Sequence, residues 1–75
     1  MTSRKQLGMR IRYLREKKRY SQLDFANECG INRNYLCDLE AGRRNPTLDI
    51  LERIATGFGI SLEELFKGIE NIPGI

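Results

Sequence analysis

The sequence contains no histidine and no tryptophan, only two cysteines and two prolines, and no long apolar run. With Cys29 and Cys37 as its only thiols, the chain lacks the four Cys or His ligands of a structural zinc site. We therefore expect no metal, no cofactor and no disulfide, but two reduced thiols in a cytoplasmic protein. No stretch reaches the about 20 apolar residues that a membrane-spanning helix requires.

The same shortages argue against an enzyme. There is no histidine to act as a general base, no nucleophile next to a base, and no glycine-rich loop for phosphate. Asp49 and Glu52 are expected on a solvated helix face rather than in a catalytic pair. A chain of 75 residues forms one small domain with little room for a pocket.

Positive charge is concentrated at one end of the chain. Residues 1–20 carry eight basic residues against the single acid Glu16, a net charge of +7, so the other 55 residues carry −4. Such an asymmetry indicates an anionic partner for the basic end. A helix whose charges are merely solvated would give the same pattern. The position of the basic run in the chain must therefore decide between an anionic partner and a solvated helix.

The basic run precedes a stretch, residues 21–42, that is typical of two short helices joined by a tight turn. Ser21 can cap the first helix and Gly30 can end it. Ile31 is an apolar plug in the turn, and Asn32 can cap the second helix. Two helices joined so closely must cross steeply.

The apolar residues of this stretch recur at helical spacing, and the rest of the second helix is polar. The expected buried positions are Leu23, Phe25, Ala26, Tyr35, Leu36 and Leu39. The polar positions of the second helix are Arg33, Asn34, Cys37 and Asp38, whose donors and acceptors can read base edges in a major groove. The pattern predicts a helix-turn-helix.

Three further helices complete an all-α, compact five-helix domain over residues 1–69. The first covers residues 4–18, the fourth runs from Thr47 to Phe58 before Gly59, and the fifth follows a capping pattern that begins at Ser61. The expected core positions of these helices are Leu7, Ile11, Leu14, Leu48, Leu51, Ile54, Ala55 and Phe58.

The last helix is unusually apolar for so small a domain. Its surplus apolar surface predicts a homodimer interface. The residues expected there are Ile50, Leu62, Leu65, Phe66 and Ile69. The short tail, residues 70–75, either frays or docks its isoleucines across the dimer.

The chain resembles the five-helix phage-repressor and Cro-like helix-turn-helix regulators over residues 7–67. The residues at that family's spacing are Ser21, Gln22, Ala26, Gly30, Leu36, Leu39, Glu40, Gly42, Pro46, Leu51, Ile54, Ala55, Leu65 and Phe66. Within the family, INRNYL followed by EAGRRNPT looks most like the small controller proteins of restriction-modification systems.

The resemblance implies a role for individual residues. It implies base reading by Arg33, Asn34, Tyr35, Cys37 and Asp38. It implies phosphate binding by Gln22, Asn32, Arg43, Arg44 and Asn45. It also implies a structural ion pair between Arg15 and Glu40, which would tie the first helix to the end of the recognition helix.

The expected function is that of a sequence-specific regulator. It would bind double-stranded operator DNA as a homodimer, with two dimers on adjacent sites as an option, control its own gene and restriction-modification genes, and need no small-molecule effector. Asp24 and Glu28 fit first-turn and surface acids, with contact to RNA polymerase as a second use. Two alternatives stay open: another short phage or plasmid repressor, and an antitoxin or adaptor that uses the same fold to bind a protein.

Overall fold

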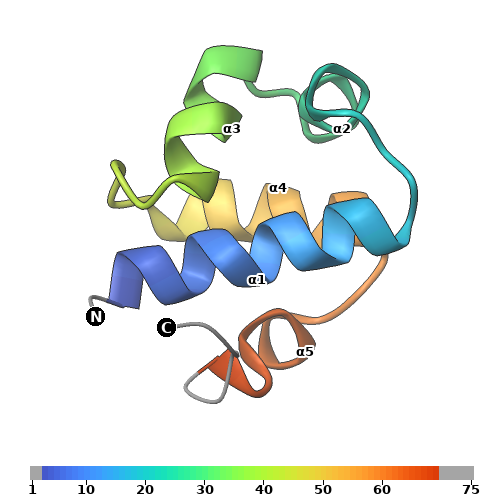
Figure 1. Cartoon of the computed structure of the whole chain (residues 1–75). Coiled ribbons are helices and arrows are strands. Elements are labelled where there is room, and N and C mark those ends of the chain that lie inside the picture. The colour runs from blue at the N-terminus through green and yellow to red at the C-terminus, as the bar shows by residue number, and fades with distance from the viewer. Residues whose placement is uncertain (1–2, 70–75) are drawn as a thin grey trace.

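The computed structural model describes residues 3–69, in which it contains five helices and no strand (Figure 1). The helices are α1 (Ser3–Lys17), α2 (Gln22–Cys29), α3 (Arg33–Glu40), α4 (Leu48–Phe58) and α5 (Leu62–Phe66). This confirms the all-α, five-helix prediction. The expectation for the tail, residues 70–75, lies outside the described residues.

Local capping sets the ends of the helices. The side chains of Ser21, Asn32, Thr47 and Ser61 each accept a hydrogen bond from a backbone N–H in the first turn of the helix that follows. At the other ends, Gly30 and Gly59 adopt left-handed φ values of 69° and 71°, and their N–H groups bond to carbonyls of α2 and α4. The predicted bounds of α1, 4–18, and the predicted start of α4 at Thr47 are each off by one residue, and the agreement is this close because these signals act within a few residues of a helix end.

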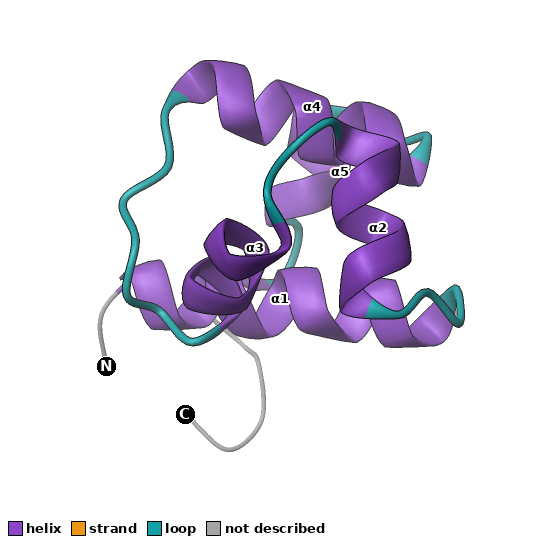
Figure 2. Cartoon of the chain, turned by 90° about the horizontal axis from the view of Figure 1, so that it is seen from above, coloured by secondary structure: helices purple, strands orange, loops and turns teal. Residues whose placement is uncertain are grey.

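The helices enclose one apolar core. Its fully enclosed side chains include Phe25 and Phe58, whose rings stack at a centroid distance of 4.1 Å. Seen from above, α1 and α4 lie on opposite sides of the molecule (Figure 2). The buried apolar residues are Leu7, Ile11, Phe25, Ala26, Cys29, Leu36, Leu39, Ile54, Ala55, Phe58 and Leu65.

Three apolar residues do not lie where the sequence predicted. Leu23 and Leu48 were expected in the core, but they are 52% and 62% exposed. Both occupy the first turn of a short helix, at the edge of its apolar stripe, where no neighbouring helix covers them. Leu65 was expected in a dimer interface but is 0% exposed. It closes the core of a single chain, so it has no surface to offer a partner.

Helix α1 approaches the end of α3 through a glycine. A Cβ atom placed on Gly8 would lie 2.5 Å from the carbonyl oxygens of both Leu39 and Glu40. Only a residue without a side chain permits the two backbones to pack this closely. The position of α3 in the fold is therefore set largely by α1.

Two arginines tie further elements together. Arg10 on α1 donates from Nε and Nη2 to the carbonyl oxygens of Leu65 and Glu64, at 3.1 and 2.8 Å, and so caps the end of α5. Arg53 on α4 donates from Nη1 to the carbonyl oxygen of Gly30 at 3.1 Å. The turn between α2 and α3 is thereby held to α4.

Candidate nucleic-acid interface

Helix α3 presents a polar face to solvent. Leu36 and Leu39 are buried against the core, whereas Arg33 and Asn34 are exposed at the start of the helix. Cys37 and Asp38, one turn further on, are half-buried. The polar residues that the sequence singled out thus share the outer side of α3, where they can meet a flat or grooved partner.

Tyr35 has a different setting from its polar neighbours. It is partly buried and packs against the core. The guanidinium carbon of Arg44 lies 5.2 Å from the centre of its ring. Tyr35 therefore supports an arginine of the following loop while keeping only part of its surface free for contact.

Two residues at the starts of α2 and α3 have side-chain hydrogen-bond donors available. Asn32 Oδ1 accepts from the N–H of Asn34 at 2.7 Å, so its side-chain NH2 group remains a donor. Gln22 Nε2 donates one hydrogen to Glu40 Oε1 at 3.1 Å and has a second one left. Both predicted phosphate-binding residues therefore lie at a helix start with an N–H to give.

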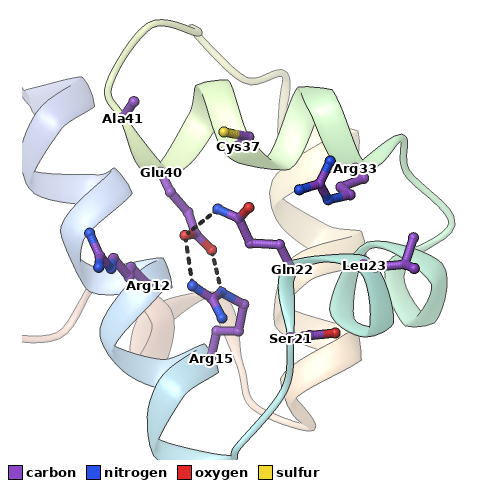
Figure 3. Close-up of a pocket in the computed structure, with 9 residues that line it drawn as sticks. All are labelled: Arg12, Arg15, Ser21, Gln22, Leu23, Arg33, Cys37, Glu40 and Ala41. Atoms are coloured by element: carbon purple, nitrogen blue, oxygen red, sulfur yellow. Dashed lines mark hydrogen bonds and ion pairs between the residues drawn. The ribbon is translucent and has the colours of Figure 1, made fainter.

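Glu40 lies at the centre of a buried hydrogen-bond network (Figure 3). Arg15 donates from Nε to Glu40 Oε2 at 2.7 Å and from Nη2 to Oε1 at 3.1 Å, and its Nη1 donates to the Tyr20 carbonyl oxygen at 2.8 Å. The side chains of Arg15 and Glu40 are only 10% and 4% exposed. The hydrogen bond to Glu40 raises the pKa of Arg15, although burial acts in the opposite direction. This is the ion pair that the resemblance implied, and it joins α1 to the end of α3.

The network forms the floor of a hollow of about 530 Å³ between α1, α2 and α3. Figure 3 shows Arg12 and Arg33 at opposite ends of this hollow. Both are exposed, whereas Arg15 is neutralised by Glu40. Arg12 also pairs with Glu16 at 3.3 Å, in an exposed contact within α1. Arg12 could not be singled out from the sequence, because its approach to α3 depends on how α1 packs.

The loop after α3 folds back on the helix. Gly42 has a φ of 79°, and the N–H of Arg43 donates to the carbonyl oxygen of Asp38 at 2.9 Å. The side chains of Arg43 and Arg44 both pair with the Asp38 carboxylate. Hydrogen bonding from Arg43 is the main reason that the pKa of Asp38 lies below its usual value. Asn45 is exposed on the same loop.

A second hollow, of about 350 Å³, is lined by the start of α1, by Asn45 and Pro46 of the loop after α3, and by residues of α4 and the end of the described chain. Its apolar lining includes Leu51, Phe66 and Ile69, and Arg4 lines it as well. Of the residues predicted to form a dimer interface, Ile50, Leu62 and Ile69 are partly buried and Phe66 is exposed. Apart from the buried Leu65, these residues keep surface available for a partner.

Within residues 3–69 no helix is both long and apolar enough to cross a membrane. The same residues contain no group of three or more Cys, Asp or Glu side chains placed to hold a metal ion.

The model of the helix-turn-helix family HTH_3 matches residues 11–65, which include all of α2, α3 and α4. The chain belongs to this family. Its members are DNA-binding transcriptional regulators and not enzymes, so this helix-turn-helix chain is a regulator of the same class.

Two sequence relatives are close. The chain is 44% identical to control protein C.MunI from a Mycoplasma species over 64 residues, which cover 84% of this chain and 86% of that protein. It is 39% identical to the regulator DdrOP3 of Deinococcus deserti over 61 residues, covering 81% of this chain and 47% of the regulator. The chain thus spans about half the length of the Deinococcus protein.

Two solved structures agree with this assignment. The restriction-modification controller protein C.AhdI from Aeromonas hydrophila matches with a TM-score of 0.81 and 37% identity, covering 83% of this chain and 94% of that one. The controller C.Esp1396I, solved as a tetramer in complex with its natural 35 base-pair operator, matches with a TM-score of 0.85 and 25% identity. That match covers 95% of this chain and 93% of the other. The predicted resemblance to controller proteins is confirmed.

Proposed function

We propose that this helix-turn-helix protein binds a pseudo-palindromic operator as a homodimer and thereby controls its own gene and neighbouring restriction-modification genes. The observation that carries the proposal is the outward polar face of α3. Exposed Arg33 and Asn34 stand at its start, and the first residue of α2, Gln22, and the cap of α3, Asn32, have side-chain N–H donors available. Such an arrangement suits a recognition helix in a major groove, with phosphate contacts on its flanks.

Arg33 is the residue best suited to read a base. It is exposed at the N-terminal end of α3, where recognition helices of this type contact base edges. A guanidinium can donate two hydrogen bonds to O6 and N7 of guanine, which gives about 1–3 kcal/mol of discrimination against other bases. Asn34 and Cys37 line the same face, and Arg43, Arg44 and Asn45 follow on the loop as phosphate contacts.

Dimerisation would use the apolar surface of α4 and α5. Phe66 and Ile69 border the second hollow, and Ile50 and Leu62 are partly exposed beside the core. Two copies related by a two-fold axis would place their α3 helices about 34 Å apart, one turn of DNA, so half-sites should lie about 10 base pairs apart. The similarity to C.Esp1396I, which forms a tetramer on its operator, supports two dimers on adjacent sites.

Regulation would follow from occupancy, because dimerisation and paired sites make binding rise steeply with protein concentration. This suits a protein that controls its own gene in the cytoplasm. Asp24 and Glu28 are exposed on α2, where they are available for contact with RNA polymerase. The similarity to C.AhdI, a restriction-modification controller protein, favours restriction-modification genes as the target over other phage or plasmid operons.

The first test is a mobility shift with the DNA upstream of the protein's own gene, in excess random competitor and at two salt concentrations. We expect stepwise complexes that survive the competitor. Complexes that random DNA removes would refute self-regulation through that DNA. Tight binding to a partner protein, with no salt-dependent affinity for any duplex, would identify an antitoxin or adaptor instead.

The roles of two arginines can then be separated by substitution. Arg33→Ala should abolish the preference for the operator over variants altered at the guanine that Arg33 reads, a loss of about 1–3 kcal/mol. Arg44→Ala should weaken operator binding and lower the salt dependence, but keep that preference, because a phosphate contact carries no sequence information. Each protein variant is titrated with the operator and with operator sequences altered at that guanine. Both roles would be refuted if Arg44→Ala lost the sequence preference while Arg33→Ala kept it.

A further inference from the structure

The last turn of α3 carries two acidic residues, Asp38 and Glu40, and no basic one. Negative charge is unfavourable at the C-terminal end of a helix. Arginines from outside the helix compensate for both acids, but in different ways. Glu40 is held by Arg15 in a pair that is almost wholly buried, whereas Asp38 is held by Arg43 and Arg44 at the surface.

The contacts at Asp38 occupy both of its carboxylate oxygens. Oδ1 accepts from Arg43 Nε at 3.1 Å and Nη2 at 2.9 Å, and Oδ2 lies 3.5 Å from Arg44 Nε. The face of the Tyr35 ring lies against the guanidinium of Arg44. The two arginines best placed to bind phosphate are therefore bound to an internal anion in the free protein.

This internal pairing can be exchanged. The side chain of Asp38 is 32% exposed and that of Arg43 is 62% exposed, and ion pairs so open to water contribute little to stability. A phosphate offers a guanidinium the same paired oxygen acceptors as a carboxylate does. Phosphate can thus replace Asp38 as the partner of the arginines, provided that the carboxylate finds a new partner of its own.

The new partner must be a hydrogen-bond donor in the groove. Asp38 lies one turn after Asn34, near the outer face of α3. The donor that an aspartate recognises on a base edge is the N4 amino group of cytosine. Where a cytosine lies opposite Asp38, the carboxylate can leave the arginines, and where it does not, the arginines stay paired and the carboxylate repels the backbone.

We propose that Asp38 is a specificity-determining residue that keeps Arg43 and Arg44 from binding phosphate until its carboxylate pairs with a cytosine amino group of the operator. The proposal rests on the operator-binding function above and deepens it. It makes one residue both a base reader and the regulator of two phosphate contacts. Random DNA then loses the contribution of the arginines as well as the base contact.

The test compares Asp38→Asn with Asp49→Asn. Both remove one negative charge by the same chemical change, but Asp49 is exposed at the start of α4. Dissociation constants are measured over a range of salt concentrations. The probes are a random-sequence duplex and an operator duplex selected from a random pool by the wild-type protein.

Asp38→Asn should raise affinity for the random duplex about tenfold, the gain expected from two added phosphate contacts, whereas Asp49→Asn should not. It should also steepen the plot of log K against log salt by about 0.9 for each arginine released. On the operator, where the arginines are already released, the slope should stay unchanged. The preference for operator over random duplex should therefore fall.

The double variant Arg43→Ala/Arg44→Ala supplies the second control. In that background Asp38→Asn should alter binding to the random duplex no more than Asp49→Asn does. The proposal is overturned if the two asparagine variants behave alike in the wild-type background, or if the gain persists without the arginines. Melting curves verify folding, and Asp38→Ala replaces the asparagine variant if that variant is unstable. A wild-type protein that binds no duplex at low salt would refute the DNA-binding function itself, whatever the variants do.

Discussion

Removal of Glu40 should destabilise the fold far more than its place at the end of a helix suggests. In Glu40→Ala, Arg15 would keep its charge in a site where its side chain is 10% exposed, with only the Tyr20 carbonyl oxygen as acceptor. Loss of one partner of a buried pair costs about 3–5 kcal/mol, because the remaining charge is left without compensation. Gln22 would lose its hydrogen bond as well.

This loss is large compared with the total free energy of unfolding. At about 0.05–0.15 kcal/mol per residue, a chain of this length has a free energy of unfolding of roughly 4–11 kcal/mol. One kcal/mol shifts the melting temperature of such a domain by about 4–8 °C, so Glu40→Ala should lower it by at least about 12 °C. Urea unfolding followed by circular dichroism measures the free energy of unfolding, and its repetition at several temperatures gives the melting temperature.

Two matched variants test the reasoning. Glu16→Ala breaks the Arg12–Glu16 pair, whose side chains are 64% and 56% exposed, and should cost no more than about 0.5 kcal/mol. The double variant Arg15→Met/Glu40→Leu removes both charges and should recover most of the stability. The explanation fails if Glu40→Ala costs as little as Glu16→Ala. It also fails if the double variant is as unstable as the single one, because an unpaired charge would then not be the cause.

Three further predictions concern packing and the thiols. Gly8→Ala should destabilise the protein by about 1–3 kcal/mol, because the added Cβ would lie 2.5 Å from backbone oxygens of α3. The better helix propensity of alanine is too small to offset this. An unchanged midpoint of urea unfolding would contradict the prediction. Burial raises the pKa of Cys29 to about 11, so at pH 8 a maleimide should modify the half-exposed Cys37 and leave Cys29 unmodified in the folded protein, as peptide mapping can verify. The thiol of Cys29 has a pKa near 9.0 in the unfolded chain, so Cys29 should not change the free energy of unfolding below that pH. The free energy of unfolding should fall as the pH rises from about 9 to about 11. An equal fall in a Cys29→Ala variant would exclude the thiol as the cause.

Much of the fold could be predicted from the sequence because its signals are local. The caps at Ser21, Asn32 and Ser61 and the glycine at position 30 act within one helical turn, so helix ends could be read directly. Apolar periodicity, by contrast, finds a stripe but not its edges. Leu23 fits the stripe of α2 and is nevertheless exposed, because burial there depends on which helix lies opposite.

The candidate site divides in the same way. The outward position of Arg33 follows from helical spacing, whereas the pairing of Asp38 with Arg43 requires the loop to turn back at Gly42. That return is a tertiary feature that spacing cannot specify. The close approach at Gly8 also lacked a signal, since a glycine within a helical pattern indicates only a weak helix position.

The buried network around Glu40 orients α3 through residues other than those proposed to read bases. Arg15, Gln22 and Glu40 fix the orientation of α3 from its inner side, and Arg33 and Asn34 face outward without taking part in that network. Exchange of the outward residues should therefore redirect the protein to new operators at little cost in stability. A change of target would thus need substitutions at only a few exposed positions, while the buried network of α3 stays as it is.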